Sequence, residues 1–143
     1  MRRHAAGAPA SAVALALALT ATLAGCGSGG RELFVLERTG TIPGARLSLR
    51  VLDDGLVACN GGAERRLGDD QLLRAREIER ELGDEARAGL RLAPGPGVVL
   101  TYRVRLHKGS LSFADTSRGL GPELLLVPAF ARSVAKGVCG LPR

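Results

Sequence analysis

Aromatic residues and lysines are scarce in this chain of 143 residues. It has no tryptophan, one tyrosine and three phenylalanines, and its only lysines are Lys108 and Lys136. Proteins that bind nucleic acids combine a clustered basic surface with aromatic side chains that stack on bases. Here the formal charge of +6 comes almost entirely from arginines, which are interleaved with aspartates and glutamates. We therefore expect a solvated surface and no nucleic-acid partner.

Metal ligands are also few, with three cysteines and two histidines. A structural zinc site takes four such ligands, and no set of them has the required spacing. The acidic turn at residues 53–55 lacks the spaced oxygen ligands of a calcium loop. The glycine-containing runs at 27–30 and 60–62 do not match a phosphate-binding loop between a strand and a helix. The sequence predicts neither a metal nor a cofactor.

The longest apolar run covers residues 12–23. It is shorter than the roughly 20 residues that a membrane-spanning helix needs, and glycines follow it instead of a basic flank. A cationic start at 1–4 and small residues at the exit complete the pattern of an export signal. We expect residues 1–25 to be a signal peptide.

Residues 23–26, Leu-Ala-Gly-Cys, resemble the bacterial lipobox at all four positions. The resemblance implies that Cys26 receives a diacylglyceryl thioether, carries acyl chains such as palmitate, and becomes the first mature residue. Two acyl chains anchor a protein stably, whereas one holds it only marginally. Residues 26–30 are then the lipidated cysteine and a flexible Gly/Ser tether, which places the protein on the extracytoplasmic face of the cell membrane. The alternative is an ordinary secreted protein with a free thiol at Cys26.

The other two cysteines, Cys59 and Cys139, are predicted to form a disulfide, because an isolated pair in an oxidising compartment is most simply paired. A nucleophilic cysteine would instead need a partner histidine, and only His107 follows the signal segment. We therefore prefer the disulfide.

Alternating apolar residues predict strands in residues 31–143. The period-2 pattern is clearest at 47–51 and 100–106, and shorter apolar runs at 32–38, 56–59 and 111–114 have strand length. These segments predict a mostly antiparallel sheet of about five strands.

Helical spacing marks two further segments. Asp69 or Asp70 can cap a helix that Gly83 bends or divides, and Pro128 fits the closing helix only in its first turn. The apolar residues with helical spacing are Leu72, Ala75, Ile78, Leu82 and Ala86 in the first segment, and Leu126, Phe130, Val134 and Val138 in the second. The expected fold is a single α+β domain over residues 31–143, with two helices covering the sheet.

His107, Ser110, Ser112 and Asp115 are residue types found in hydrolase triads. A serine nucleophile needs a base and an oxyanion hole beside its hydroxyl. These four residues belong to one short hairpin, where strand alternation separates many of them onto opposite faces. We expect a polar hairpin and no enzyme.

The order of these elements is similar to that of the emfourin-like family, small α+β proteins that include inhibitors of thermolysin-type metalloproteases. The similarity covers the strand at 46–49, the acidic turn, the leucine-rich helix, the strands around 102–104 and 112–115, and the closing helix. It implies an extracellular protease as partner, with Ile42, Pro43 and Gly44 as the contact loop. Small actinobacterial lipoproteins of unknown role look similar too, including the Cys-Asn-Gly-Gly and Val-Cys-Gly-Leu-Pro elements.

The sequence therefore predicts a lipid-anchored, non-catalytic binding domain. Two alternatives stay open at this point. One is a carrier or sensor of an apolar ligand at the membrane, suggested by the leucine content and the short tether. The other is a structural envelope lipoprotein without a ligand.

Overall fold

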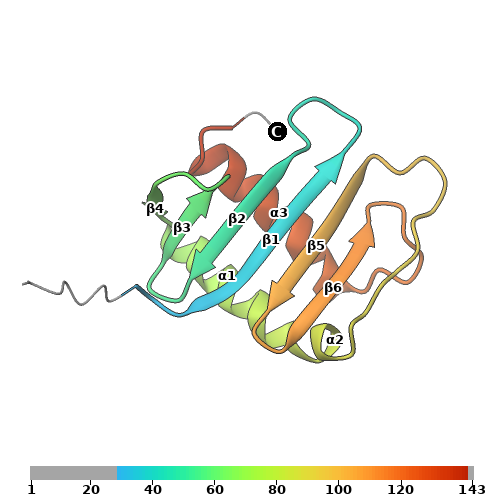
Figure 1. Cartoon of the computed structure of the whole chain (residues 1–143), viewed down its shortest axis with the longest axis horizontal. Coiled ribbons are helices and arrows are strands. Elements are labelled where there is room, and N and C mark those ends of the chain that lie inside the picture. The colour runs from blue at the N-terminus through green and yellow to red at the C-terminus, as the bar shows by residue number, and fades with distance from the viewer. Residues whose placement is uncertain (1–28, 142–143) are drawn as a thin grey trace, which may run out of the picture.

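The computed structural model describes residues 29–141 of the chain, which contain six strands and three helices. The elements are β1 (Glu32–Gly40), β2 (Leu47–Leu52), β3 (Leu56–Cys59), β4 (Glu64–Arg66), α1 (Asp69–Glu81), α2 (Gly83–Arg87), β5 (Leu100–Leu106), β6 (Gly109–Ala114) and α3 (Pro122–Gly137). The strands form one sheet, and the helices cover one of its faces (Figure 1). The predicted α+β class is confirmed, with six strands instead of about five and three helices instead of two.

The sheet has the strand order β4-β3-β2-β1-β5-β6, and all neighbouring strands are antiparallel. β1 lies near the centre, between β2 and β5. The chain leaves the sheet after β4, forms α1 and α2, and returns along the outer edge of β6. There the backbone of Leu90 and Leu92 bonds to Ser112, so this edge is partly covered.

Strand alternation places one apolar row of each strand except β4 against the helices. Leu47, Leu49 and Val51 of β2 are at most 1% exposed, as the period-2 pattern predicts. β1 instead buries four consecutive residues, 33–36, because its register shifts between Glu32 and Phe34. An extra residue at such a shift can point inward beside its neighbour. This accounts for the adjacent buried residues Leu33 and Phe34, whereas Val35 lies on the other face beside Arg103 and Arg105.

Two elements differ from the sequence-based expectation. β4 was not predicted, because its residues Glu64, Arg65 and Arg66 are all exposed and carry no apolar pattern. The single predicted helix is divided into α1 and α2 at Leu82 and Gly83, in agreement with the breaking effect expected of that glycine.

The N-terminal end of α1 also needs a correction. Gly68, and neither Asp69 nor Asp70, is the N-cap residue, and its N–H donates a hydrogen bond of 3.0 Å to Gln71 Oε1. The two aspartates lie in the first helical turn, where their charge still stabilises the positive end of the helix dipole.

The closing helix begins earlier than the sequence suggested. Gly121 is its N-cap residue and Pro122 occupies its first turn, so Pro128 lies inside α3 and the prediction for Pro128 was wrong. The strict four-residue spacing was also inaccurate: Leu126 and Val138 are only half-buried. The buried residues of α3 are Leu124, Val127, Phe130, Ala131, Val134 and Ala135. They follow the true helical period of 3.6 residues.

Candidate functional site

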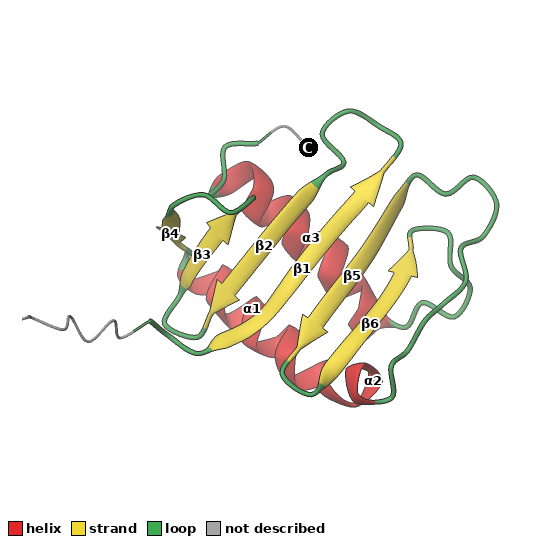
Figure 2. Ribbon diagram, viewed as in Figure 1, coloured by secondary structure: helices red, strands yellow, loops and turns green. Residues whose placement is uncertain are grey.

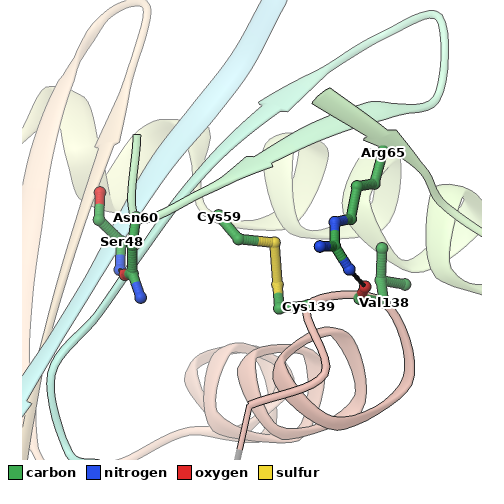
Figure 3. Close-up of a disulfide and its surroundings, with 6 residues drawn as sticks. All are labelled: Ser48, Cys59, Asn60, Arg65, Val138 and Cys139. Carbon is green, nitrogen blue, oxygen red and sulfur yellow. Dashed lines mark hydrogen bonds between the residues drawn. A yellow bond between two sulfur atoms is a disulfide. The ribbon is translucent and has the colours of Figure 1, made fainter. Parts of the chain in front are cut away.

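The predicted disulfide joins Cys59, at the end of β3, to Cys139, just beyond α3 (Figure 3). Their Cα atoms are 5.9 Å apart, and the bond closes a loop with a sequence separation of 80 residues. Arg65 of β4 contributes a second tie at this end by donating a hydrogen bond of 2.9 Å to the carbonyl oxygen of Val138. The C-terminal end of α3 is thereby fastened to the β3–β4 side of the sheet.

The β1–β2 loop, residues 41–46, contains the predicted contact residues Ile42, Pro43 and Gly44. All three are exposed, and the Ile42 side chain has 46% of its surface accessible. Arg38 of β1 holds this loop, and it is only 5% exposed. Its guanidinium donates hydrogen bonds to the carbonyl oxygens of Gly44 at 3.0 Å and Ala45 at 2.9 Å. A buried charge therefore fixes the backbone that displays Ile42.

The loop before β5, residues 93–99, lies beside the β1–β2 loop. The N–H of Thr41 donates to the carbonyl oxygen of Val99 at 3.1 Å, which extends the β1–β5 ladder beyond the strands. The loops approach so closely at Gly40 that a Cβ there would overlap the Val99 carbonyl oxygen. Val98 precedes Val99 in this loop and is 36% exposed. We call residues 41–46 and 93–99 together the apex.

The second loop of the apex is also tied down by side chains. The carboxylate of Asp115 accepts hydrogen bonds from the backbone N–H groups of Val99 at 3.2 Å and Leu100 at 3.0 Å. The Thr116 hydroxyl donates to the carbonyl oxygen of Gly95 at 3.1 Å. The apex is therefore preorganised on both sides. Sequence reasoning found Ile42 but missed Val98, because only the folded sheet brings the two loops together.

The described chain begins at the opposite end of the sheet. The Gly30 N–H donates to Asp54 Oδ2 at 3.1 Å, and Arg31 forms an ion pair of 2.6 Å with Glu79 of α1. Hydrogen bonding to Glu79 is the main reason that the pKa of Arg31 is raised. With nine residues in β1 at about 3.4 Å each, roughly 25–30 Å separates this end from the apex. Cys26 and the predicted signal peptide lie outside the described residues.

The four hydrolase-type residues are not brought together. His107 lies in the exposed β5–β6 turn and Asp115 lies beyond the other end of β6, so the six residues of that strand separate them by roughly 20 Å. Ser110 and Ser112 share the sheet face away from the helices. Asp115 uses both carboxylate oxygens on backbone N–H groups, as described above.

Tyr102, the only tyrosine, has a perturbed pKa. Its ring is 3% exposed and stacks on Phe113 with centroids 5.3 Å apart. Burial is the main cause of the raised pKa, Asp115 adds to it, and the charges of Arg38 and Arg132 oppose it. The neutral phenol is therefore favoured in the folded protein.

This perturbation predicts a loss of stability at alkaline pH. Above about pH 10 the unfolded chain releases the phenol proton while the folded chain retains it, so the free energy of unfolding falls as the pH rises. Absorbance titration of the single tyrosine should give a midpoint above pH 10. The Tyr102→Phe variant should lose less stability between pH 9 and 11 than the parent protein. Equal losses in the two proteins would contradict this assignment.

Five hollows in residues 29–141 are lined mainly by surface residues of loops, turns, helices and the uncovered sheet face. Within the same residues, no three His, Cys, Asp or Glu side chains are grouped to hold a metal ion. None of the helices described has the length and apolar character to cross a membrane.

Comparisons of the chain with protein-family models, curated proteins and solved structures found no match.

Proposed function

We propose that this protein is a lipid-anchored, extracytoplasmic binding domain without catalytic activity, and that it holds an extracellular protein through the apex. The observation that carries the proposal is the exposed Ile42 on a loop whose backbone is held by side-chain hydrogen bonds. The buried Arg38 donates hydrogen bonds to the loop backbone, and the two loops of the apex each expose an aliphatic side chain, Ile42 and Val98. Rigid loops bind with a smaller entropic cost than mobile ones.

A thermolysin-type metalloprotease is the partner that the emfourin-like resemblance favours. The apex supports this choice because an inhibitor must present a short, rigid, partly apolar segment to a cleft. Ile42 and Pro43 supply the apolar character, while the bonds to Arg38 restrict the backbone. An inhibitor of this kind acts by binding alone.

The position of the proposed anchor is compatible with this role. A lipid on Cys26 would hold the end of the sheet near Gly30 and Arg31 at the membrane, since residues 27–29 span only about 10 Å as a flexible chain. The apex lies at the other end of β1 (Figure 1). A partner could thus reach it from the extracellular side without contacting the lipid.

The interior gives the apolar-carrier alternative no support. The space between sheet and helices is filled by one continuous cluster of buried side chains, and the hollows named above open on the surface. A carrier would need an apolar pocket that encloses most of its ligand.

An inhibition assay tests the proposal for the apex. The full chain, purified in detergent, is titrated against a panel of thermolysin-type proteases. We expect stoichiometric inhibition of at least one, weakened at least tenfold by Ile42→Asp, because a carboxylate would be desolvated in the protease cleft. The matched control is Leu73→Asp on α1, an exposed leucine away from the apex. No inhibition of any protease, or equal weakening by both variants, would refute this version.

Membrane fractionation tests the anchor separately. Cys26→Ala should release the full chain from the membrane fraction, while the parent protein is retained. Release by this variant together with unchanged protease inhibition in solution would show that anchoring and binding are independent. Unchanged membrane retention of Cys26→Ala would contradict the assignment of the lipid to Cys26.

A further inference from the structure

The face of the sheet away from the helices carries a polar trough. Figure 2 looks onto this face, and none of the described helices covers it. One hollow of about 400 Å³ lies over β1, β5 and β6 and includes Arg103, Ser112 and Arg91 in its lining. A second, of about 600 Å³, lies over β1 and β2 and includes Arg46. Both share Glu37 and Thr39, so they form one trough across the strands.

Sheet register places two arginines on either side of a serine hydroxyl. Ser112 of β6 pairs with Arg103 of β5 on one side and with Arg91 of the edge segment on the other. Paired residues of neighbouring strands project to the same face and lie about 5 Å apart, so the two arginine Cα atoms are roughly 10 Å apart. Their guanidinium groups can therefore approach one oxyanion held over Ser112.

The charge of these arginines is not balanced within the described residues. Arg50 and Arg105 on the same face form ion pairs with glutamates, at 2.6 Å and 3.8 Å. In residues 29–141, by contrast, Arg46, Arg91 and Arg103 have no carboxylate within 4.0 Å. Glu37 lies opposite Arg103 in the register and is the one acidic residue in the lining of the two hollows. The trough thus has an excess of positive charge.

Side chains with hydroxyl and amide groups line the trough between the arginines. Thr39, Thr101 and Ser110 line the trough beside Arg103, and Ser48 and Asn60 line it near Arg46. Such groups exchange hydrogen bonds with hydroxyl-bearing ligands, whereas guanidinium groups bind phosphate oxygens in pairs. The pattern of an anion site at each end and hydroxyls between them matches a chain of polyols linked by phosphodiesters.

We infer that the trough binds an extended polyol-phosphate polymer. This function is distinct from that of the apex, because most of the lining belongs to the uncovered sheet face; Arg46 is the one residue that the lining shares with the apex. An acidic peptide fits less well, since β5 is paired on both sides and the outer edge of β6 is partly covered by residues 90–92. In addition, Leu111 is the single apolar side chain lining the hollow of about 400 Å³ near these strands. Nucleic acid fits less well because the four aromatic residues all lie in the core and none is available for stacking.

Titration with synthetic poly(glycerol phosphate) tests the inference. The full chain in detergent should bind this polymer at low ionic strength, and binding should weaken as salt is added. The double variant Arg91→Gln/Arg103→Gln should bind at least tenfold more weakly, with a shallower salt dependence. Glu37→Gln should bind about two- to threefold more tightly, because the opposing charge is removed.

The control variant is Arg118→Gln/Arg132→Gln, which removes the same charge from two other exposed arginines outside the trough. Its affinity should change by less than twofold, and the melting temperatures of all variants should confirm that they fold. Absence of polymer binding by the parent protein, or equal weakening in both double variants, would overturn the inference. Polyglutamate of equal charge that binds as tightly as the phosphate polymer would overturn it in favour of an acidic peptide.

Discussion

We expect the replacement of both Cys59 and Cys139 with alanine to lower the free energy of unfolding by about 2–4 kcal/mol. The disulfide closes a loop with a sequence separation of 80 residues, and in the chain-entropy account a cross-link of this span restricts the unfolded chain strongly. The folded state loses a contact as well, because Cys139 is 8% exposed and packs against the core. Denaturant unfolding of the parent and the double variant measures the difference.

Reductant supplies the control for this prediction. It should lower the stability of the parent protein to the level of the double variant and leave that variant unchanged. The double variant is preferred to either single one, because a single substitution leaves a reactive thiol that can pair between molecules. Equal stability of the oxidised parent and the double variant would show that the bond does not contribute. In that case the hydrogen bond from Arg65 to the carbonyl oxygen of Val138 would still hold the C-terminal end of α3 to the sheet without the disulfide.

Phe34→Ala should have the larger effect, a loss of about 3–5 kcal/mol, because truncating a buried phenylalanine removes its transfer energy and leaves a cavity. Phe34 lies in β1 at the centre of the sheet and is fully buried. Its ring contacts that of Phe130 in α3 edge-to-face, with centroids 5.6 Å apart. This pair therefore joins the sheet to its longest helix. Since small domains are stable by only about 5–15 kcal/mol, the variant should be close to unfolding.

A volume-conserving variant and a double-mutant cycle make this prediction specific. Phe34→Leu should cost less than about 1.5 kcal/mol. Combining Phe34→Leu with Phe130→Leu should reveal a coupling of about 0.5–1.5 kcal/mol for the aromatic contact. Additive losses in the cycle would mean that the two rings contribute through burial alone. A loss below 1 kcal/mol for Phe34→Ala would contradict the central role of this residue.

The sheet was largely predictable from the sequence because strand alternation is a local property. The buried face of β2 can be predicted without reference to any other segment, from the spacing of Leu47, Leu49 and Val51. β4 carries no such signal, since all of its residues face solvent and only pairing with β3 makes them a strand. Pro128 was misplaced for another reason. α3 begins at Pro122, where proline suits the first helical turn, so Pro128 lies inside the helix.

The candidate apex was half predictable. Ile42, Pro43 and Gly44 stand out as a loop between two strands, but Val98 is more than fifty positions away and joins them only through the β1–β5 pairing. The buried position of Arg38 was also unpredictable, because an arginine in an amphipathic strand normally faces water. It is buried because the loop supplies two carbonyl oxygens to its guanidinium group.

The α+β class, the alternation of most strands and the pairing of Cys59 with Cys139 can be predicted from the amino-acid order, since they depend on local period and on a count of two candidate cysteines. The residues that share a surface are known only from the folded chain. The apex and the trough both combine residues from segments distant in the chain, brought together by the strand order β4-β3-β2-β1-β5-β6. A binding surface forms where residues of neighbouring strands lie side by side, and no local sequence pattern predicts which residues these are.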